Sequence, residues 1–170
     1  MIDYFISDTH FFHGNILKFT GDDGNLVRPG FRSLEDMNEC MITRWNETVT
    51  PQDRVTHLGD VSWRYGDQLR DVLKKLNGRK RLLVGNHDDI PKLLSLGVFE
   101  TIELWIGFNN CILTHVPMHP CSLFDKKLNI HGHIHEKDVG DSRFVNVSVE
   151  RTNYYPVTFE WIEKRSQGLV

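Results

Sequence analysis

Five segments of the chain share one pattern, a short apolar run followed directly by Asp, Asn, His or Gly. Each apolar run has the length of a buried strand, so each polar group of residues stands where a strand would end. In order, the polar groups are Asp8-Thr9-His10, Gly59-Asp60, Gly85-Asn86-His87-Asp88, Thr114-His115 and Gly132-His133-Ile134-His135. Because ligands of α/β sheets bind outside the carboxyl ends of the strands, the pattern predicts one shared pocket.

These strand ends would bring two Asp, one Asn and at least four His side chains together. Residues two apart on an extended segment point the same way, so Asp8 with His10, and His133 with His135, can each act as a pair. Seven mixed oxygen and nitrogen donors are too many for one tetrahedral zinc ion and suit two divalent ions that share a carboxylate. Two ions about 3.5–4 Å apart favour in-line attack of hydroxide on phosphorus.

In this order, the five segments resemble the successive motifs of the calcineurin-like metallophosphoesterases. The resemblance runs from Asp8 to His135, about three quarters of the chain. The opening run Ser7-Asp8-Thr9-His10-Phe11-Phe12-His13-Gly14-Asn15-Ile16 and the pair Arg28-Pro29 are further similar to a small bacterial and phage-borne subgroup of predicted phosphoesterases.

The resemblance implies an α/β fold in which two mostly mixed β-sheets pack as a sandwich flanked by helices, in four αββα layers, with a dinuclear site at one edge. It implies that the first ion is held by Asp8, His10 and His135, the second by Asn86, His115 and His133, and that Asp60 bridges them. His87 matches the family's histidine that stabilises or protonates the leaving oxygen. Asp88 is a candidate to orient His87, and Asp67 is the alternative.

The function implied is hydrolysis of a phosphoester with two divalent ions, Mn²⁺ by family resemblance, with Fe²⁺ or Zn²⁺ also suited to the donors. The protein-phosphatase branch continues Gly-Asp as Gly-Asp-x-x-Asp-Arg-Gly, but here the run is Gly59-Asp60-Val61-Ser62-Trp63-Arg64-Tyr65-Gly66. The absent Asp-Arg pair argues against a protein phosphatase. The short chain leaves little room for a capping domain, so we expect an open site for a small phosphomonoester, a nucleotide or a phosphodiester.

Two other classes of protein compete with this hypothesis. A catalytically silent scaffold of the same fold is disfavoured because the ligand set and His87 are all present. A metallo-β-lactamase would continue its His-x-His as x-Asp-His, whereas Glu136-Lys137 follows His135. An amidohydrolase would carry His-x-His on its first strand, where this chain has Asp8-Thr9-His10.

Hydrophobic periodicity and turn residues predict alternating strands and helices early in the chain and hairpin-like strands later. We expect strands at Ile2–Ser7, Arg54–Leu58, Arg81–Val84, Phe99–Ile106, Cys111–Thr114, Leu128–Ile130 and Arg143–Val149, and helices after Ser33, at Asp67–Leu76, around Pro91–Leu96 and, after Pro156, a short one within Tyr155–Arg165. The residues Thr20 to Gly30 read as a long loop.

Length and charge limit the remaining possibilities. The 170 residues fit a single domain, residues 1–170, without a separate cap. A net charge of −3 makes stable nucleic-acid binding a poor expectation, and no apolar run is long enough to cross a membrane. Three cysteines without metal-ligand spacing, and an N-terminus without a basic region, predict a cytoplasmic protein. The oligomeric state is not predicted.

Several residues near the motifs have open roles. His13 could reach the substrate phosphate or be a polar loop residue, and His119 could line the pocket. Arg28 could bind phosphate, although an exposed loop arginine is the ordinary case. We expect His57 to be a satisfied buried histidine and His131 to support a ligand from behind. The four tryptophans, Trp45, Trp63, Trp105 and Trp161, are expected to be packing residues, and only Trp63, close to Asp60, is also placed to stack on a base.

Overall fold

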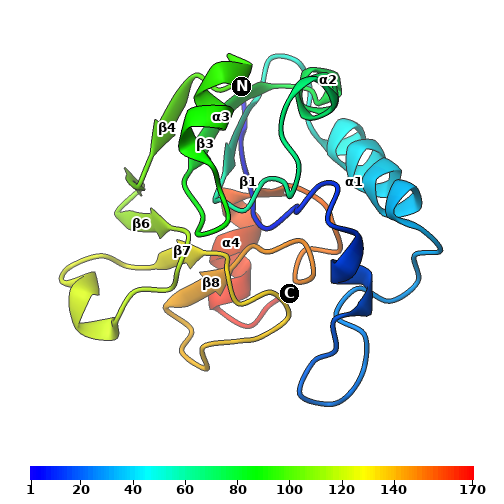
Figure 1. Ribbon diagram of the computed structural model, residues 1–170. Helices are drawn as coiled ribbons and strands as arrows, with labels where there is room; N and C mark the ends of the chain where they lie inside the picture. The colour runs from blue at the N-terminus through cyan, green and yellow to red at the C-terminus, as the bar shows by residue number, and fades with distance from the viewer.

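The computed structural model describes residues 1–170 and contains two β-sheets packed face to face. The first sheet has the order β4-β3-β2-β1-β9, in which β1 to β4 are parallel and β9 is antiparallel. The second has the order β5-β6-β7-β8, with one antiparallel pair, β5 with β6. The predicted sandwich of two mixed sheets flanked by helices is confirmed (Figure 1).

The elements follow the predicted alternation closely. The strands are β1 (Asp3–Ile6), β2 (Arg54–His57), β3 (Arg79–Leu83), β4 (Thr101–Glu103), β5 (Trp105–Phe108), β6 (Cys111–Thr114), β7 (Asn129–His131), β8 (Phe144–Asn146) and β9 (Val157–Thr158). The helices are α1 (Leu34–Thr48), α2 (Asp67–Lys75), α3 (Ile90–Leu96) and α4 (Phe159–Ser166), with 3₁₀ turns η1 (Gly14–Lys18) and η2 (Pro120–Leu123). None of these helices has the length and apolar character needed to span a bilayer.

The first sheet is apolar on both faces because each face covers a different part of the core. Tyr4 and Ile6 of β1 face α1, α2 and α3, whereas Phe5 between them faces the second sheet. This alternation divides the core into a helix-side cluster and a cluster between the sheets. α4 packs against β8, β9 and β1, so it covers strands of both sheets (Figure 1).

One segment differs from its predicted form. The single strand expected at Phe99–Ile106 is two strands, since β4 pairs with β3 in the first sheet and β5 pairs with β6 in the second. The chain passes from one sheet to the other at Leu104, which is exposed. The alternation of apolar residues continues through this point, so the sequence gives no sign that the strand changes its partner. The short helix predicted after Pro156 is confirmed as α4, and the two-residue strand β9 precedes it.

α1 begins where the sequence indicates, at Ser33. The Ser33 hydroxyl accepts a hydrogen bond from the backbone N–H of Asp36 at 3.1 Å, which satisfies one of the free N–H groups of the first turn. The Asp36 carboxylate accepts from the backbone N–H of Arg32, one residue before the cap. α1 then buries Met37, Met41 and Trp45 against the first sheet.

We predict that Ser33→Ala lowers the free energy of unfolding by about 1 kcal/mol, because the Asp36 N–H loses its acceptor. Urea unfolding followed by circular dichroism measures the change. Ser142→Ala is the matched control, since this exposed serine makes no side-chain hydrogen bond in the structure. Equal stability of the two variants would show that the Ser33 cap does not hold the start of α1.

Candidate metal centre

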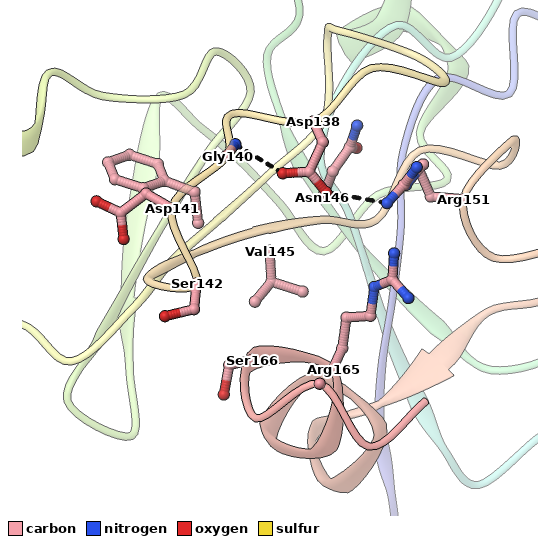
Figure 2. Close-up of a pocket in the computed structure, with 11 residues that line it drawn as sticks. Asp138, Gly140, Asp141, Ser142, Val145, Asn146, Arg151, Arg165 and Ser166 are labelled. Carbon is pink, nitrogen blue, oxygen red and sulfur yellow. Dashed lines mark hydrogen bonds and ion pairs between the residues drawn. The ribbon is translucent and has the colours of Figure 1, made fainter.

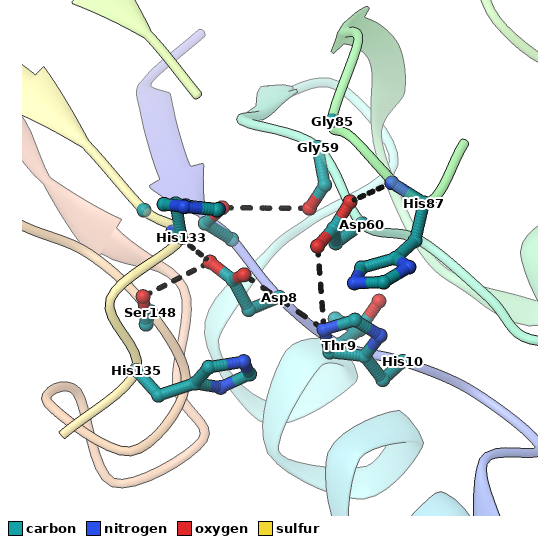
Figure 3. A network of polar contacts seen from close by, with 12 residues as sticks. Asp8, Thr9, His10, Gly59, Asp60, Gly85, His87, His133, His135 and Ser148 are labelled. Atoms are coloured by element: carbon teal, nitrogen blue, oxygen red, sulfur yellow. Dashed lines mark hydrogen bonds and ion pairs between the residues drawn. The ribbon is translucent and has the colours of Figure 1, made fainter. Parts of the chain in front are cut away.

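The carboxyl ends of β1, β2 and β3 and of β6 and β7 meet at one edge of the sandwich, and the five polar segments follow them. A short parallel bridge between Ser7 and Ser148 joins the two sheets at this edge. Two groups of side chains result, each with ligand atoms within 4.8 Å of one another: Asp8, His10 and His135, and Asp60, His115 and His133 (Figure 3). The structure thus brings together all six of these predicted ligands.

Asp60 connects the two groups. Its Oδ2 lies 3.5 Å from His10 Nε2 and 3.4 Å from His115 Nε2, and its Oδ1 accepts the backbone N–H of His87 at 2.9 Å. Burial by itself raises the pKa of Asp60, but hydrogen bonding and charge interaction with His115 outweigh it and hold the pKa well below its usual range. A carboxylate that stays ionised between two donor groups is the geometry that a bridging ligand needs.

Several ligand atoms of the first group have no hydrogen-bond partner in the protein. Asp8 Oδ1 and both ring nitrogens of His10 are buried without a hydrogen-bond partner. Burial lowers the pKa of His10 to about 3, so its ring stays neutral and offers a lone pair. Buried polar atoms are almost always paired, so this group of orphaned atoms fits a cation that would accept their electron pairs.

The second group shows the same fit through its hydrogen bonding. His115 Nδ1 lies 2.7 Å from the carbonyl oxygen of Leu58, and because a carbonyl only accepts, Nδ1 carries the proton. Burial by itself lowers the pKa of His115, but the carboxylates of Asp60 and Asp8 raise it, so Nε2 also carries a proton, which points at Asn86 Oδ1 at 2.9 Å and at Asp60 Oδ2. A bound cation would displace that proton and take the Nε2 lone pair. His133 Nδ1 lies 2.8 Å from the same Asn86 oxygen. Converging electron pairs of this kind suit a cation, and Asn86 lies where a further ligand would be.

The backbone at the site is strained. Asp8, His10, Asp60, His133 and His135 all have positive φ, between 46° and 71°. Residues other than glycine adopt this left-handed region at a cost of about 1–3 kcal/mol, and such residues gather at functional sites. The conformation turns each strand end sharply, so that the side chains point into the shared pocket.

Two glycines let the strand ends approach one another. A Cβ on Gly85 would overlap the backbone nitrogen and side chain of Asp60, and a Cβ on Gly132 would overlap Ser7 and Asp8. Neither glycine has a positive φ, so close approach alone requires them.

His87 stands at the rim of the site. Its side chain is exposed and lines a cavity of about 360 Å³ together with His10 and His135. Its ring centroid is 5.7 Å from that of His10. The His87 imidazole makes no hydrogen bond to the protein, so it is free to contact a molecule in the cavity.

Asp88 has a different task from the one expected. Its carboxylate accepts three backbone N–H groups, from Asp60 at 2.9 Å, Val61 at 2.9 Å and Gly85 at 2.8 Å. It therefore ties the β2 end to the β3 end and does not contact the His87 ring. Asp67, the alternative partner, pairs with Arg70 on α2 at 2.5 Å. The prediction that Asp88 or Asp67 orients the His87 ring is therefore wrong for both residues.

Arg28 was expected to be an exposed loop residue or a phosphate ligand, and the structure contradicts both. Its side chain is completely buried behind the site. It donates to the backbone carbonyls of Asp8 at 2.5 Å and Thr9 at 3.1 Å, and to Glu150 Oε1 at 2.7 Å. The guanidinium therefore secures the turn after β1.

Glu150, which the motifs do not include, supports the first group. Its Oε1 lies 2.9 Å from His135 Nδ1, which leaves Nε2 of His135 for the pocket. Burial by itself raises the pKa of Glu150, but Arg28 and His135 lower it to about 2. A carboxylate behind a ligating histidine fixes its ring and tautomer. The signal in the sequence was the strand-like segment Phe144 to Val149, in which Asn146 and Ser148 alternate with valines and which ends at Glu150.

The other histidines take mixed roles. His57 is a satisfied buried residue, as predicted, with Nε2 3.0 Å from Thr9 Oγ1 and Nδ1 accepting the Gly59 N–H. His13 lines the cavity beside His10, whereas His119 only caps η2 through the Cys121 N–H and lines no cavity. His131 contacts the Gly132 carbonyl and no ligand side chain.

A further cavity of about 300 Å³ lies between the loop after β7 and α4 (Figure 2). Its charged groups are engaged locally, since Arg151 pairs with Asp138 at 3.0 Å and Arg165 donates to the Val170 carbonyl at 2.7 Å. None of the predicted site residues lines it, so it is separate from the candidate metal centre.

The two-sheet fold, the order of the motifs and the paired donor groups agree with what the resemblance to the calcineurin-like metallophosphoesterases implies. The chain belongs to the same family as the uncharacterized protein MJ1445 of Methanocaldococcus jannaschii, with 36% identity over 170 aligned positions that cover 95% of this chain and 89% of that protein.

A solved structure of a protein of unknown function, AQ665 from Aquifex aeolicus, has 28% identity and a TM-score of 0.75, covering 96% of this chain and 98% of that one. A solved archaeal phosphodiesterase has 22% identity and a TM-score of 0.47, covering 86% and 82%. No protein-family profile matches the sequence.

We predict that Glu150→Gln weakens binding of Mn²⁺ by roughly 10- to 100-fold, because His135 loses the carboxylate that orients it. Isothermal titration calorimetry of metal-stripped protein with Mn²⁺ measures the affinity. Glu160→Gln is the control, since Glu160 pairs only with Lys164 on the exposed side of α4. Unchanged affinity in Glu150→Gln would remove this residue from the support of the site.

Proposed function

We propose that this protein is a metal-dependent phosphoesterase that hydrolyses a small phosphomonoester, a nucleotide or a phosphodiester. The observation that supports it most is Asp60, a buried carboxylate with a lowered pKa that lies between two His/Asp donor groups. Such paired groups fit two divalent ions, of which we favour Mn²⁺ over Fe²⁺ or Zn²⁺.

The proposed ligands are Asp8, His10 and His135 for one ion, Asn86, His115 and His133 for the other, and Asp60 for both. When bound, two such ions neutralise phosphate oxygens and acidify a water molecule for in-line attack. The protein's own part is to hold the donors rigidly. Asp88 fixes the backbone around Asp60, and Arg28 with Glu150 fixes the donors of the first group.

His87 is the proposed general acid. Its exposed imidazole faces the cavity and lacks a protein partner, so a proton on one ring nitrogen can be donated to the leaving oxygen of the substrate. Its backbone N–H, bonded to Asp60 Oδ1, holds the backbone of His87 beside that carboxylate.

The exposed free thiol of Cys121 suits a reducing compartment, and we propose the cytoplasm as the location of the protein.

The first test compares hydrolysis of p-nitrophenyl phosphate and of bis-p-nitrophenyl phosphate by metal-stripped protein before and after addition of Mn²⁺. We expect activity only after the metal is added. Turnover of the bis-ester alone indicates a phosphodiesterase, and turnover of the monoester indicates a phosphatase. Protein that holds two ions and cleaves neither ester would contradict the proposal and favour a scaffold role.

We predict that His87→Ala lowers kcat by roughly 10²- to 10⁴-fold while the bound metal stays the same, because only the proton donor is lost. We expect the Asp60→Asn variant to lose both its activity and its bound metal. His119→Ala is the matched histidine control, because this residue lies outside every cavity, and its activity should be unchanged. Full activity of His87→Ala would exclude His87 as the general acid.

A further inference from the structure

The cavity beside the candidate metal centre has an aromatic wall. Phe19 and Trp63 line it together with the candidate ligands His10 and His135, and they remain 47% and 51% exposed. Large aromatic side chains are usually buried, and these two gain no core contacts in this position. Two exposed aromatic rings at the rim of a polar site mark a surface suited to a planar ligand.

Trp63 is held in place before any ligand arrives. Its backbone N–H donates to the Phe11 carbonyl at 2.9 Å. Its ring stacks on His13, with centroids 4.2 Å apart and planes inclined by 9°, and Phe19 lies edge-on to His13, with centroids 5.5 Å apart. A ring that is already immobilised loses little conformational entropy when a ligand stacks on it.

The same tryptophan also lines an adjoining cleft of about 510 Å³, so it stands between the cleft and the cavity. Arg64 lies in that cleft, and its guanidinium makes no hydrogen bond or ion pair in the structure. The other cation there, Lys92, is already paired with Asp89 at 2.6 Å. The cleft therefore offers one free group of planar hydrogen-bond donors beside the indole.

Resting on the proposed function, we propose that the substrate is a nucleotide whose base stacks on Trp63. The phosphate would lie against His10, His87 and His135, and the base would extend along Trp63 toward Arg64. A nucleobase combines a flat aromatic face with polar edges, which matches an indole beside a free guanidinium. An aliphatic alcohol would use neither feature.

The test compares binding of two phosphonates in which a methylene group replaces the ester oxygen, so that hydrolysis cannot occur: the analogue of adenosine 5′-phosphate and the analogue of ribose 5-phosphate. Calorimetry with Mn²⁺-loaded protein gives each Kd. We expect the adenosine compound to bind roughly tenfold more tightly, the scale of base–aromatic stacking. Equal affinities would overturn the proposal.

Variants assign the difference to the indole. Trp63→Ala should bring the two affinities together, and Trp63→Phe should keep part of the preference. Trp105→Ala is the matched control, because this tryptophan is also exposed, at 61%, but lines no cavity. A preference for the base that survives in Trp63→Ala would also overturn the proposal, provided that its thermal unfolding shows a folded protein.

The result is separate from the test of phosphoesterase activity. A base preference that depends on Trp63, in protein that cleaves no ester, would support the subsite and reject the phosphoesterase. Turnover of nitrophenyl esters without any base preference would support the phosphoesterase and reject the subsite.

Discussion

The buried ion pair between Arg28 and Glu150 is the interaction on which the candidate metal centre depends. The two residues are 122 positions apart, one in the loop before α1 and the other after β8. Through backbone carbonyls Arg28 holds the turn that carries Asp8, and through its carboxylate Glu150 holds His135. The ion pair thereby fixes the positions of three segments relative to one another: the loop that carries Arg28, the turn that carries Asp8 and the loop that carries His135. A buried charge pair is costly to desolvate, so its many hydrogen bonds are what make it tolerable.

The site itself is destabilising for the fold. Asp8 Oδ1 and the ring nitrogens of His10 are buried without partners, and five candidate ligands hold left-handed backbone. Each such feature costs on the order of 1–3 kcal/mol. They persist because their surroundings leave no alternative: Ser148 and the His133 N–H hold the second oxygen of Asp8, and Asp88 holds the backbone of Asp60. Cation binding would offset part of this cost by satisfying the same atoms.

Much of the fold and the candidate ligands could be predicted from the sequence because both follow local patterns. An apolar run that ends in Asp or His marks a strand end, and parallel strands bring their ends to one edge. Long-range pairing is not local, and there the prediction failed. Nothing near Arg28 indicates that Glu150 would bury it, and nothing within Phe99–Ile106 shows that β4 and β5 belong to different sheets. Asp88 was misjudged because its neighbour in sequence, His87, suggested a partner, while its three bonds go to backbone atoms.

The buried and the exposed residues of the candidate metal centre have different tasks. The buried residues supply and position the candidate metal ligands, and the exposed residues are free to contact a bound molecule. Asp8 and His10 are buried, and Ser148 and the His133 N–H hold the Asp8 carboxylate from behind. Asn86 and His87 are exposed at the rim, on the loop that Asp88 anchors. The imidazole of His87, which makes no hydrogen bond to the protein, and the exposed part of the Trp63 ring remain available to a bound molecule. In the proposed phosphoesterase, selectivity would come from these exposed residues, because the buried donors would treat every phosphate alike.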